Sequence, residues 1–174
     1  MERNSNKVAA MRDRALFSLA IATGMRASAL LNINVDDIDF ENSCISVIEK
    51  RQKIREIPIG ENTMCVLQEW LAVRNKEFED IDIDAVFVSQ KSGRLSPDAA
   101  NDSLRKYCDM AGIQKKITMH KLRATAACSL AKAGIPLKAI QKQLGHASSQ
   151  TTLIYIDVFN EDMDKARNIL DDLF

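Results

Sequence analysis

The strongest constraint on the fold of this chain is a series of stretches with helical periodicity, several of which end at a glycine. In the stretch 11–24, four residues recur at helical spacing, Leu16, Leu19, Ala20 and Thr23, and Gly24 follows them. Residues at that spacing form one buried face of a helix, and glycine favours the left-handed conformation that commonly follows a helix C-terminus. Such patterns predict helices over 11–24, 26–33, 61–77, 97–112, 119–134 and 136–145, a further helical segment that carries Tyr155, and a last one over 161–174.

Two short stretches interrupt the helical pattern. CISVI (44–48) and IREIPI (54–59) are rich in β-branched residues and alternate along the chain, which is typical of strands. The basic EKRQK between them predicts a hairpin with a charged, exposed tip, and AVFVS (85–89) could form a short third strand. We therefore expect a mainly α fold with a small antiparallel β-sheet near its N-terminal third, in the α+β class.

Length and composition indicate an ordinary globular protein. The 174 residues fit one domain (1–174) that is large enough to bury a core. No apolar run approaches the ~20 residues of a membrane helix, and the first ten residues lack the apolar region of a signal peptide. We expect a cytoplasmic protein with no membrane association. The four cysteines are widely spaced without a CxxC pair, so reduced thiols are expected rather than a zinc site or disulfides.

The net charge of zero, from 24 basic and 24 acidic residues, gives no overall sign of a polyanionic partner. The charges are unevenly distributed, however. Residues 49–55 and 113–123 are basic, whereas 77–85 and 161–172 are acidic. A neutral total can therefore contain one basic face, and composition alone leaves the function open.

Two segments place cationic side chains where they can hold an anion. In TGMRASALL (23–31), Arg26 stands just past a helix-ending glycine, where a side chain can point outward; an ordinary surface arginine is the alternative. In MHKLR, His120 and Arg123 are separated by three positions and share a helix face. Together they can grip one anionic group, although this spacing also arises by chance.

Two other segments have the same ambiguity. Lys50 lies at the tip of the predicted hairpin, where a solubilising turn is the alternative. LGHASSQTTLIY (144–155) places His146 after a helix end and Tyr155 nine residues later, and a half-buried aromatic is the alternative for Tyr155. The chain contains two histidines and two tyrosines, so one of each within this segment is unusual.

The order of these residues, Arg, Lys, His-x-x-Arg, His, Tyr, resembles the active-site series of the tyrosine recombinases, the phage-integrase family. TGMRASALL resembles the first-arginine box, and Lys50 stands where the hairpin lysine belongs, shortly before the IP of the second strand. MHKLRATAA resembles the His-x-x-Arg box, and LGHASSQTTLIY resembles the box with the second histidine and the nucleophile. The resemblance covers nearly the whole chain and implies the tyrosine-recombinase catalytic-domain architecture. It departs at Ala29, where an acidic residue is usual, and at Ala124, where histidine is frequent.

The resemblance also implies roles. Arg26, Arg123 and His146 would bind the scissile phosphate, and Tyr155 would be the nucleophile. His120 would act as the base and Lys50 would protonate the departing 5′ oxygen. The family forms a 3′-phosphotyrosyl link with a free 5′ hydroxyl and rejoins strands without ATP. It implies no cofactor and no metal. The implied partner is a double-stranded DNA recombination site, on which the full-length protein would form a tetramer.

Three functions stay open on the sequence. They are an integrase or recombinase of a phage or mobile element, a topoisomerase-like relaxing activity, and a catalytically weak DNA-binding remnant. Because family members usually carry a core-site-binding domain before this one, we expect the chain to be a catalytic-domain fragment. The predicted helix over 161–174 has a narrow apolar stripe that either packs on its own domain or docks on a neighbouring subunit.

Overall fold

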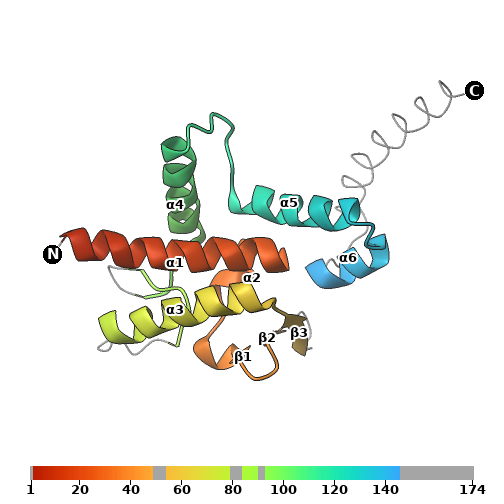
Figure 1. Cartoon of the computed structure of the whole chain (residues 1–174), viewed down its shortest axis with the longest axis horizontal. Coiled ribbons are helices and arrows are strands. Elements are labelled where there is room, and N and C mark those ends of the chain that lie inside the picture. Colours follow the sequence, from red (N-terminus) through yellow and green to blue (C-terminus); the bar gives the residue numbers. More distant parts are fainter. Residues whose placement is uncertain (1, 49–53, 79–83, 90–92, 146–174) are drawn as a thin grey trace, which may run out of the picture.

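The computed structural model describes residues 2–48, 54–78, 84–89 and 93–145, and it is mainly helical with one small sheet (Figure 1). The α-helices are α1 (Glu2–Thr23), α2 (Ala27–Leu31), α3 (Glu61–Glu77), α4 (Pro97–Met110), α5 (Met119–Lys132) and α6 (Leu137–Leu144), and a 3-10 turn, η1, spans Val35–Asp37. The strands are β1 (Ile38–Asp39), β2 (Cys44–Ile48) and β3 (Ile54–Pro58), antiparallel in the order β1-β2-β3. The predicted α+β class is confirmed.

The expectation of a third strand at residues 85–89 is wrong. Residues 85–89 make isolated bridges, from Ala85 to Asn34 and from Val88 to Arg94, and do not join the sheet. The run from Ala85 to Val88 is fully buried, which is why its composition suggests a strand. The third strand is instead β1, whose two residues are too few to produce a periodic signal.

Helix α1 is longer than its apolar pattern predicts, because it begins at Glu2 rather than near residue 11. Val8 continues the buried face toward the N-terminus, and so does the charged Arg12. The Arg12 guanidinium stays buried by bonding the Asp13 carboxylate at 2.7 Å and the Val88 carbonyl at 3.2 Å. A paired charge can therefore occupy a core-facing position that an apolar pattern excludes.

Helix α1 is the element around which the main core is built. It packs along α3 and also contacts α2, α4 and α5 (Figure 1). Leu16 and Leu19 are fully buried in this core, as their spacing predicts, together with Trp70 and Phe87. The indole N–H of Trp70 donates to the Val86 carbonyl at 2.9 Å, so its burial leaves this polar group satisfied.

A second, smaller apolar cluster lies between α5 and α6. Its buried members are Ala127, Ile140 and Leu144. The two clusters meet at Gly24, the residue that follows α1 and has a φ of +62°. A Cβ at this position would collide with the side chain of Leu144, so glycine is required both for the turn and for the close approach of α6.

The described residues also bear on the expectations for membrane helices and for the cysteines. Across the described ranges, no helix has the combined length and apolar character needed to cross a membrane. The four cysteines are free thiols, of which Cys44 and Cys108 are buried and Cys65 is exposed. Burial raises the pKa of the Cys44 thiol above its usual value, so this thiol stays protonated at neutral pH.

We predict that Gly24→Ala destabilises the protein more than Gly112→Ala does. Gly112 also has a left-handed φ, +69°, but no atom lies within 4 Å of the position of an added Cβ. Both variants incur about 1–2 kcal/mol for a left-handed non-glycine residue. Gly24→Ala adds about 1–3 kcal/mol from overpacking against Leu144. Urea unfolding of the two variants measures the difference, and equal losses would contradict the proposed contact.

Candidate active site

The C-terminal end of α6 gathers arginines from three other parts of the chain. The last carbonyls of a helix have no partner within it and carry partial negative charge. Here they accept hydrogen bonds from guanidinium groups of the α1–α2 turn, of β3 and of α5. The donors are Arg26, Arg55 and Arg123, and the acceptors are the carbonyl oxygens of Lys142, Gln143, Leu144 and Gly145. We call these three side chains the arginine cluster.

Arg123 is the buried member of the cluster, with 3% of its surface exposed. Its Nη1 donates to the Gly24 carbonyl at 2.6 Å and its Nη2 donates to the Leu144 carbonyl at 3.0 Å. A buried charge is tolerated when it is fully hydrogen-bonded, and bonds from a charged donor are stronger than neutral ones. Arg123 therefore joins the end of α1, helix α5 and the end of α6 through one rigid group.

Arg26 is exposed, and the turn before it sets its position. The Thr23 hydroxyl donates to the Leu19 carbonyl at 2.7 Å and accepts from the Met25 N–H at 3.2 Å, which fixes the turn. Arg26 follows as the extended residue at the start of α2, and its Nη1 donates to the Gly145 carbonyl at 3.2 Å. A guanidinium has five N–H donors, so the exposed Arg26 keeps donors accessible to a ligand while it holds α6.

His120 lies in the first turn of α5, one turn before Arg123. The start of this helix is fixed by the Thr118 hydroxyl, which accepts from the Lys121 N–H at 3.3 Å, and by the Asn101 side chain, which accepts from the Met119 N–H at 3.0 Å. His120 is exposed whereas Arg123 is buried. The predicted pair thus places an accessible imidazole on the helix that carries the buried guanidinium.

Three of the six predicted site residues, Lys50, His146 and Tyr155, lie outside the described residues. Their roles stay predictions. In the chain, however, His146 directly follows Gly145, whose carbonyl accepts from Arg26. Lys50 belongs to the segment 49–53 that joins β2 to β3.

Arg55 is a member of the cluster that the sequence reasoning missed, because it was treated as part of the basic run 49–55 and of a predicted strand and was given no role in the site. The half-buried Arg55 donates from Nη1 to the carbonyls of Gln143 at 2.8 Å and Lys142 at 3.2 Å. The signal was the alternation of IREIPI. Arg55 shares the face of Ile57 and Ile59, which are both buried.

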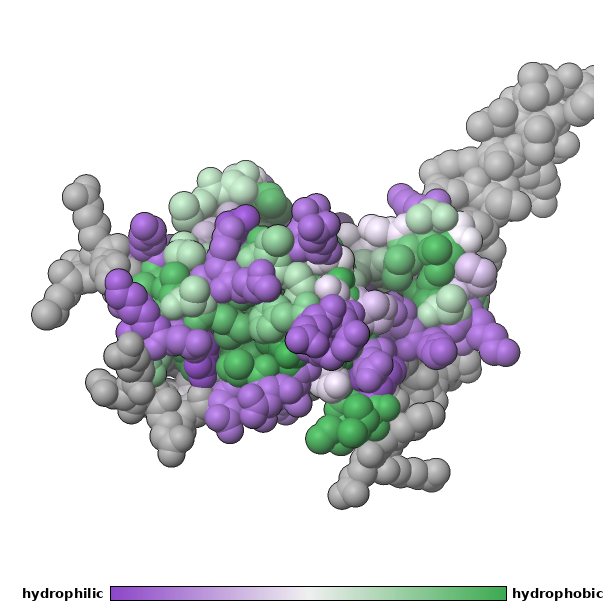
Figure 2. Space-filling model, turned by 60° about the horizontal axis from the view of Figure 1, so that its bottom comes forward, coloured by the Kyte–Doolittle hydropathy of each residue, from purple (hydrophilic) through white to green (hydrophobic). Residues whose placement is uncertain are grey.

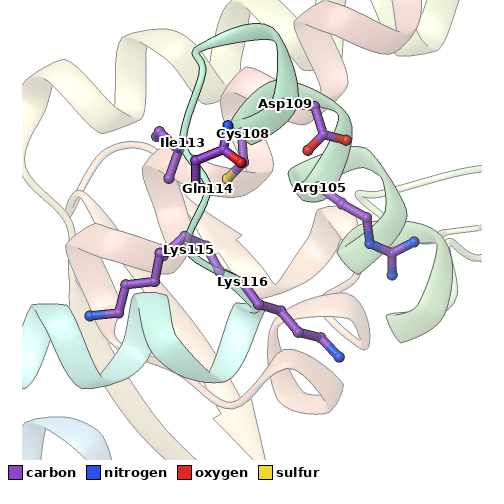
Figure 3. A pocket seen from close by; sticks show the side chains of 8 residues that line it. Arg105, Cys108, Asp109, Ile113, Gln114, Lys115 and Lys116 are labelled. Carbon is purple, nitrogen blue, oxygen red and sulfur yellow. The ribbon is translucent and has the colours of Figure 1, made fainter.

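The basic stretch 113–123 leads into α5 beside a hollow at the end of α4. Arg105, Lys115 and Lys116 line this hollow together with Cys108, and their charged ends point away from the thiol toward solvent (Figure 3). The Lys121 ammonium donates to the Lys116 carbonyl, which holds the stretch against α5. The hollow thus carries three cationic side chains and one carboxylate, that of Asp109, and two of the cations belong to the stretch that precedes His120 in the chain. Within the described residues, no group of three or more His, Cys, Asp or Glu side chains is placed to hold a metal ion.

We predict that Arg123→Ala and Arg26→Ala differ sharply in stability. Removing Arg123 deletes two hydrogen bonds from a charged donor and leaves the buried carbonyls of Gly24 and Leu144 without that donor. The free energy of unfolding should therefore fall by about 2–4 kcal/mol. The exposed Arg26 makes one longer bond, and its removal should change the stability by no more than about 0.5 kcal/mol. Urea denaturation midpoints measure both. Equal effects would mean that the cluster does not hold α6 through Arg123.

Comparison with known proteins identifies relatives. A family model described as the phage integrase family matches residues 1–162. The tyrosine recombinase XerC of Alcanivorax borkumensis is 35% identical over 146 residues, which cover 84% of this chain and 48% of the relative. XerC of Corynebacterium glutamicum is 34% identical over 165 residues, which cover 95% and 53%. The chain therefore spans about half the length of the curated relatives it matches.

Solved structures show the same fold. The crystal structure of XerA recombinase matches with a TM-score of 0.79 and 32% identity, over 96% of this chain and 62% of that one. XerH site-specific recombinase bound to palindromic difH substrate, in a post-cleavage complex, matches with a TM-score of 0.79 and 27% identity, over 92% and 46%. These likenesses confirm the predicted architecture. With its boxes in order, its matching fold and its sequence relatives, the chain belongs to the phage integrase family.

Proposed function

We propose that this chain is the catalytic domain of a site-specific DNA recombinase that cleaves and rejoins strands through a 3′-phosphotyrosyl intermediate. The observation that carries the proposal is the convergence of Arg26 and Arg123, from two separate sequence boxes, on the helix end that leads to His146. The relatives named tyrosine recombinase XerC support the reaction class. The XerH structure on its difH substrate supports DNA as the partner.

The two arginines suit the electrostatics of phosphoryl transfer. A DNA phosphodiester repels nucleophiles through its charge, and its pentacoordinate transition state is more highly charged. Guanidinium groups of Arg26 and Arg123 facing the non-bridging oxygens would stabilise that state. Because Arg123 is held by two carbonyls at 2.6 and 3.0 Å, its direction is set before substrate binds. Such preorganised charge acts without the cost of reorientation during the reaction.

The covalent step uses the remaining predicted residues. The Tyr155 oxygen attacks the phosphorus, and its proton passes to His120. The bond from phosphorus to the 5′ oxygen breaks, and Lys50 gives that oxygen a proton. His146 donates to the phosphate and positions Tyr155. A tyrosine hydroxyl has a reference pKa of ~10, so the transfer of its proton to a base is a necessary part of the attack.

The proposal extends to the domain, the DNA partner and the assembly. In this proposal residues 1–174 form one catalytic domain, the partner is a double-stranded recombination site, and the full-length protein acts in the cytoplasm as a tetramer on DNA. The basic stretches 49–55 and 113–123 would contact the phosphate backbone. The alternative of a catalytically weak DNA-binding remnant is favoured by one observation. Ala29, exposed on α2, replaces the acidic residue usual in the first-arginine box.

Covalent capture on DNA tests the proposal. We expect the protein, incubated with a library of nicked suicide duplexes of randomised core sequence, to give a denaturation-resistant protein–DNA adduct. Tyr155→Phe should give none, because the attacking oxygen is removed. Arg123→Ala and Arg26→Ala should slow adduct formation by about 10²–10³-fold, the usual effect of removing one group that stabilises transition-state charge.

Arg14→Ala is a matched control, since this exposed arginine pairs with Glu69 on the surface and should leave the rate unchanged. Sequencing of the captured duplexes identifies the preferred site. Binding of the same duplexes without any adduct at low salt would favour the DNA-binding remnant. An adduct that persists in Tyr155→Phe would contradict the assigned nucleophile.

A further inference from the structure

The outer half of the β2–β3 hairpin extends beyond the packed core. Ile57 on β3 is fully buried, but Ile54 at its start is 66% exposed and its partner Ile48 on β2 is 76% exposed. Figure 2 shows a face of mixed hydropathy with a strongly apolar projection at its lower edge. Apolar packing therefore holds the base of the hairpin and does not hold the part next to segment 49–53.

Arg55 supplies a different restraint at this point of the hairpin. It pairs with Val47 across the strands and lies between exposed Ile54 and buried Ile57 along β3. Its Nη1 bonds the carbonyls of Lys142 and Gln143, which are 87 and 88 residues away in the chain. These bonds join β3 to the same helix end that Arg26 and Arg123 bind.

We propose that Arg55 is a positioning residue, which ties β3 to the end of α6 and so holds the hairpin that carries Lys50 in register with Arg26 and Arg123. This inference rests on the proposed function. Arg55 acts through Lys50, because its Nη1 is engaged with two backbone carbonyls at the end of α6 and its strand directly follows the segment that contains Lys50 in the chain. Its loss should therefore impair protonation of the leaving group and spare the attack by Tyr155.

A change of leaving atom separates these two effects. With a normal substrate, the bond from phosphorus to the 5′ oxygen breaks and the oxygen takes a proton from the Lys50 ammonium. When sulfur replaces that bridging oxygen, the same bond breaks and a thiolate departs. A thiol has a pKa of ~8.5, so the thiolate is stable at neutral to mildly basic pH and needs no proton from the protein. A defect confined to leaving-group protonation should disappear on the sulfur substrate.

The experiment compares adduct formation on matched duplexes that contain a bridging 5′ oxygen or a bridging 5′ sulfur. Arg55→Ala should be about 10²-fold slower than wild type on oxygen, within the range of a lost general acid, and equal to wild type on sulfur. Lys50→Ala should show the same pattern. Arg55→Lys, which keeps a cationic donor, should recover part of the rate on oxygen. Arg14→Ala, an exposed arginine paired with Glu69, should match wild type on both substrates.

Two outcomes would overturn the inference. If Arg55→Ala is equally slow on oxygen and sulfur while Lys50→Ala is rescued by sulfur, Arg55 does not act through the lysine, and the proposed function stands. If wild type forms no adduct on either substrate, the proposed function fails and the inference fails with it. Should Arg55→Ala lose its helical circular dichroism, Arg55→Gln, which keeps an uncharged donor, carries the same comparison.

Discussion

Capping of the α6 C-terminus by arginine is the interaction on which the rest of this site depends. Helix α6 has eight residues and a small apolar cluster of its own, so packing alone gives it a limited hold on the domain. Its terminal carbonyls carry a charge equivalent to about −0.5. Arg123, which is only 3% exposed, is stabilised by that charge through its bond to the Leu144 carbonyl. The helix end and the guanidinium thus stabilise each other.

One arrangement therefore serves both the fold and the proposed chemistry. The bond of Arg123 to Gly24 joins the small cluster between α5 and α6 to the main core around α1. The same bond holds the Arg123 guanidinium in one orientation. Transition-state stabilisation requires a charged group that is already oriented before the reaction. Gly24 completes the arrangement, because a Cβ there would collide with the Leu144 side chain and force it to shift. A change that loosens this junction should alter stability and catalysis together.

The sequence predicts the helices of the described residues, the hairpin strands and three described members of the site, because these depend on local periodicity and on ordered boxes. The predicted helical segment that carries Tyr155 and the predicted helix over 161–174 lie outside the described residues. It does not predict the arginine cluster, since Arg26, Arg55 and Arg123 find acceptors between 21 and 119 residues away. Backbone carbonyls have no residue identity, so no motif marks them as partners. The early start of α1 was missed because the buried apolar face has one member before residue 11 among the residues with described burial, Val8, which is too few to give a helical period. The misplaced third strand was a buried loop with strand-like composition.

A structure of the Tyr155→Phe variant bound to a duplex that the protein with Tyr155 captures is the most direct test of the central claim. The account predicts that Arg123 keeps its bonds to the Gly24 and Leu144 carbonyls while it and Arg26 donate to the scissile phosphate, at the ~2.7–2.9 Å of charge-assisted bonds. A scissile phosphate bound elsewhere would contradict the account. An Arg123 side chain that leaves both carbonyls to reach the phosphate would contradict it equally, because the guanidinium would then not be oriented by the helix end.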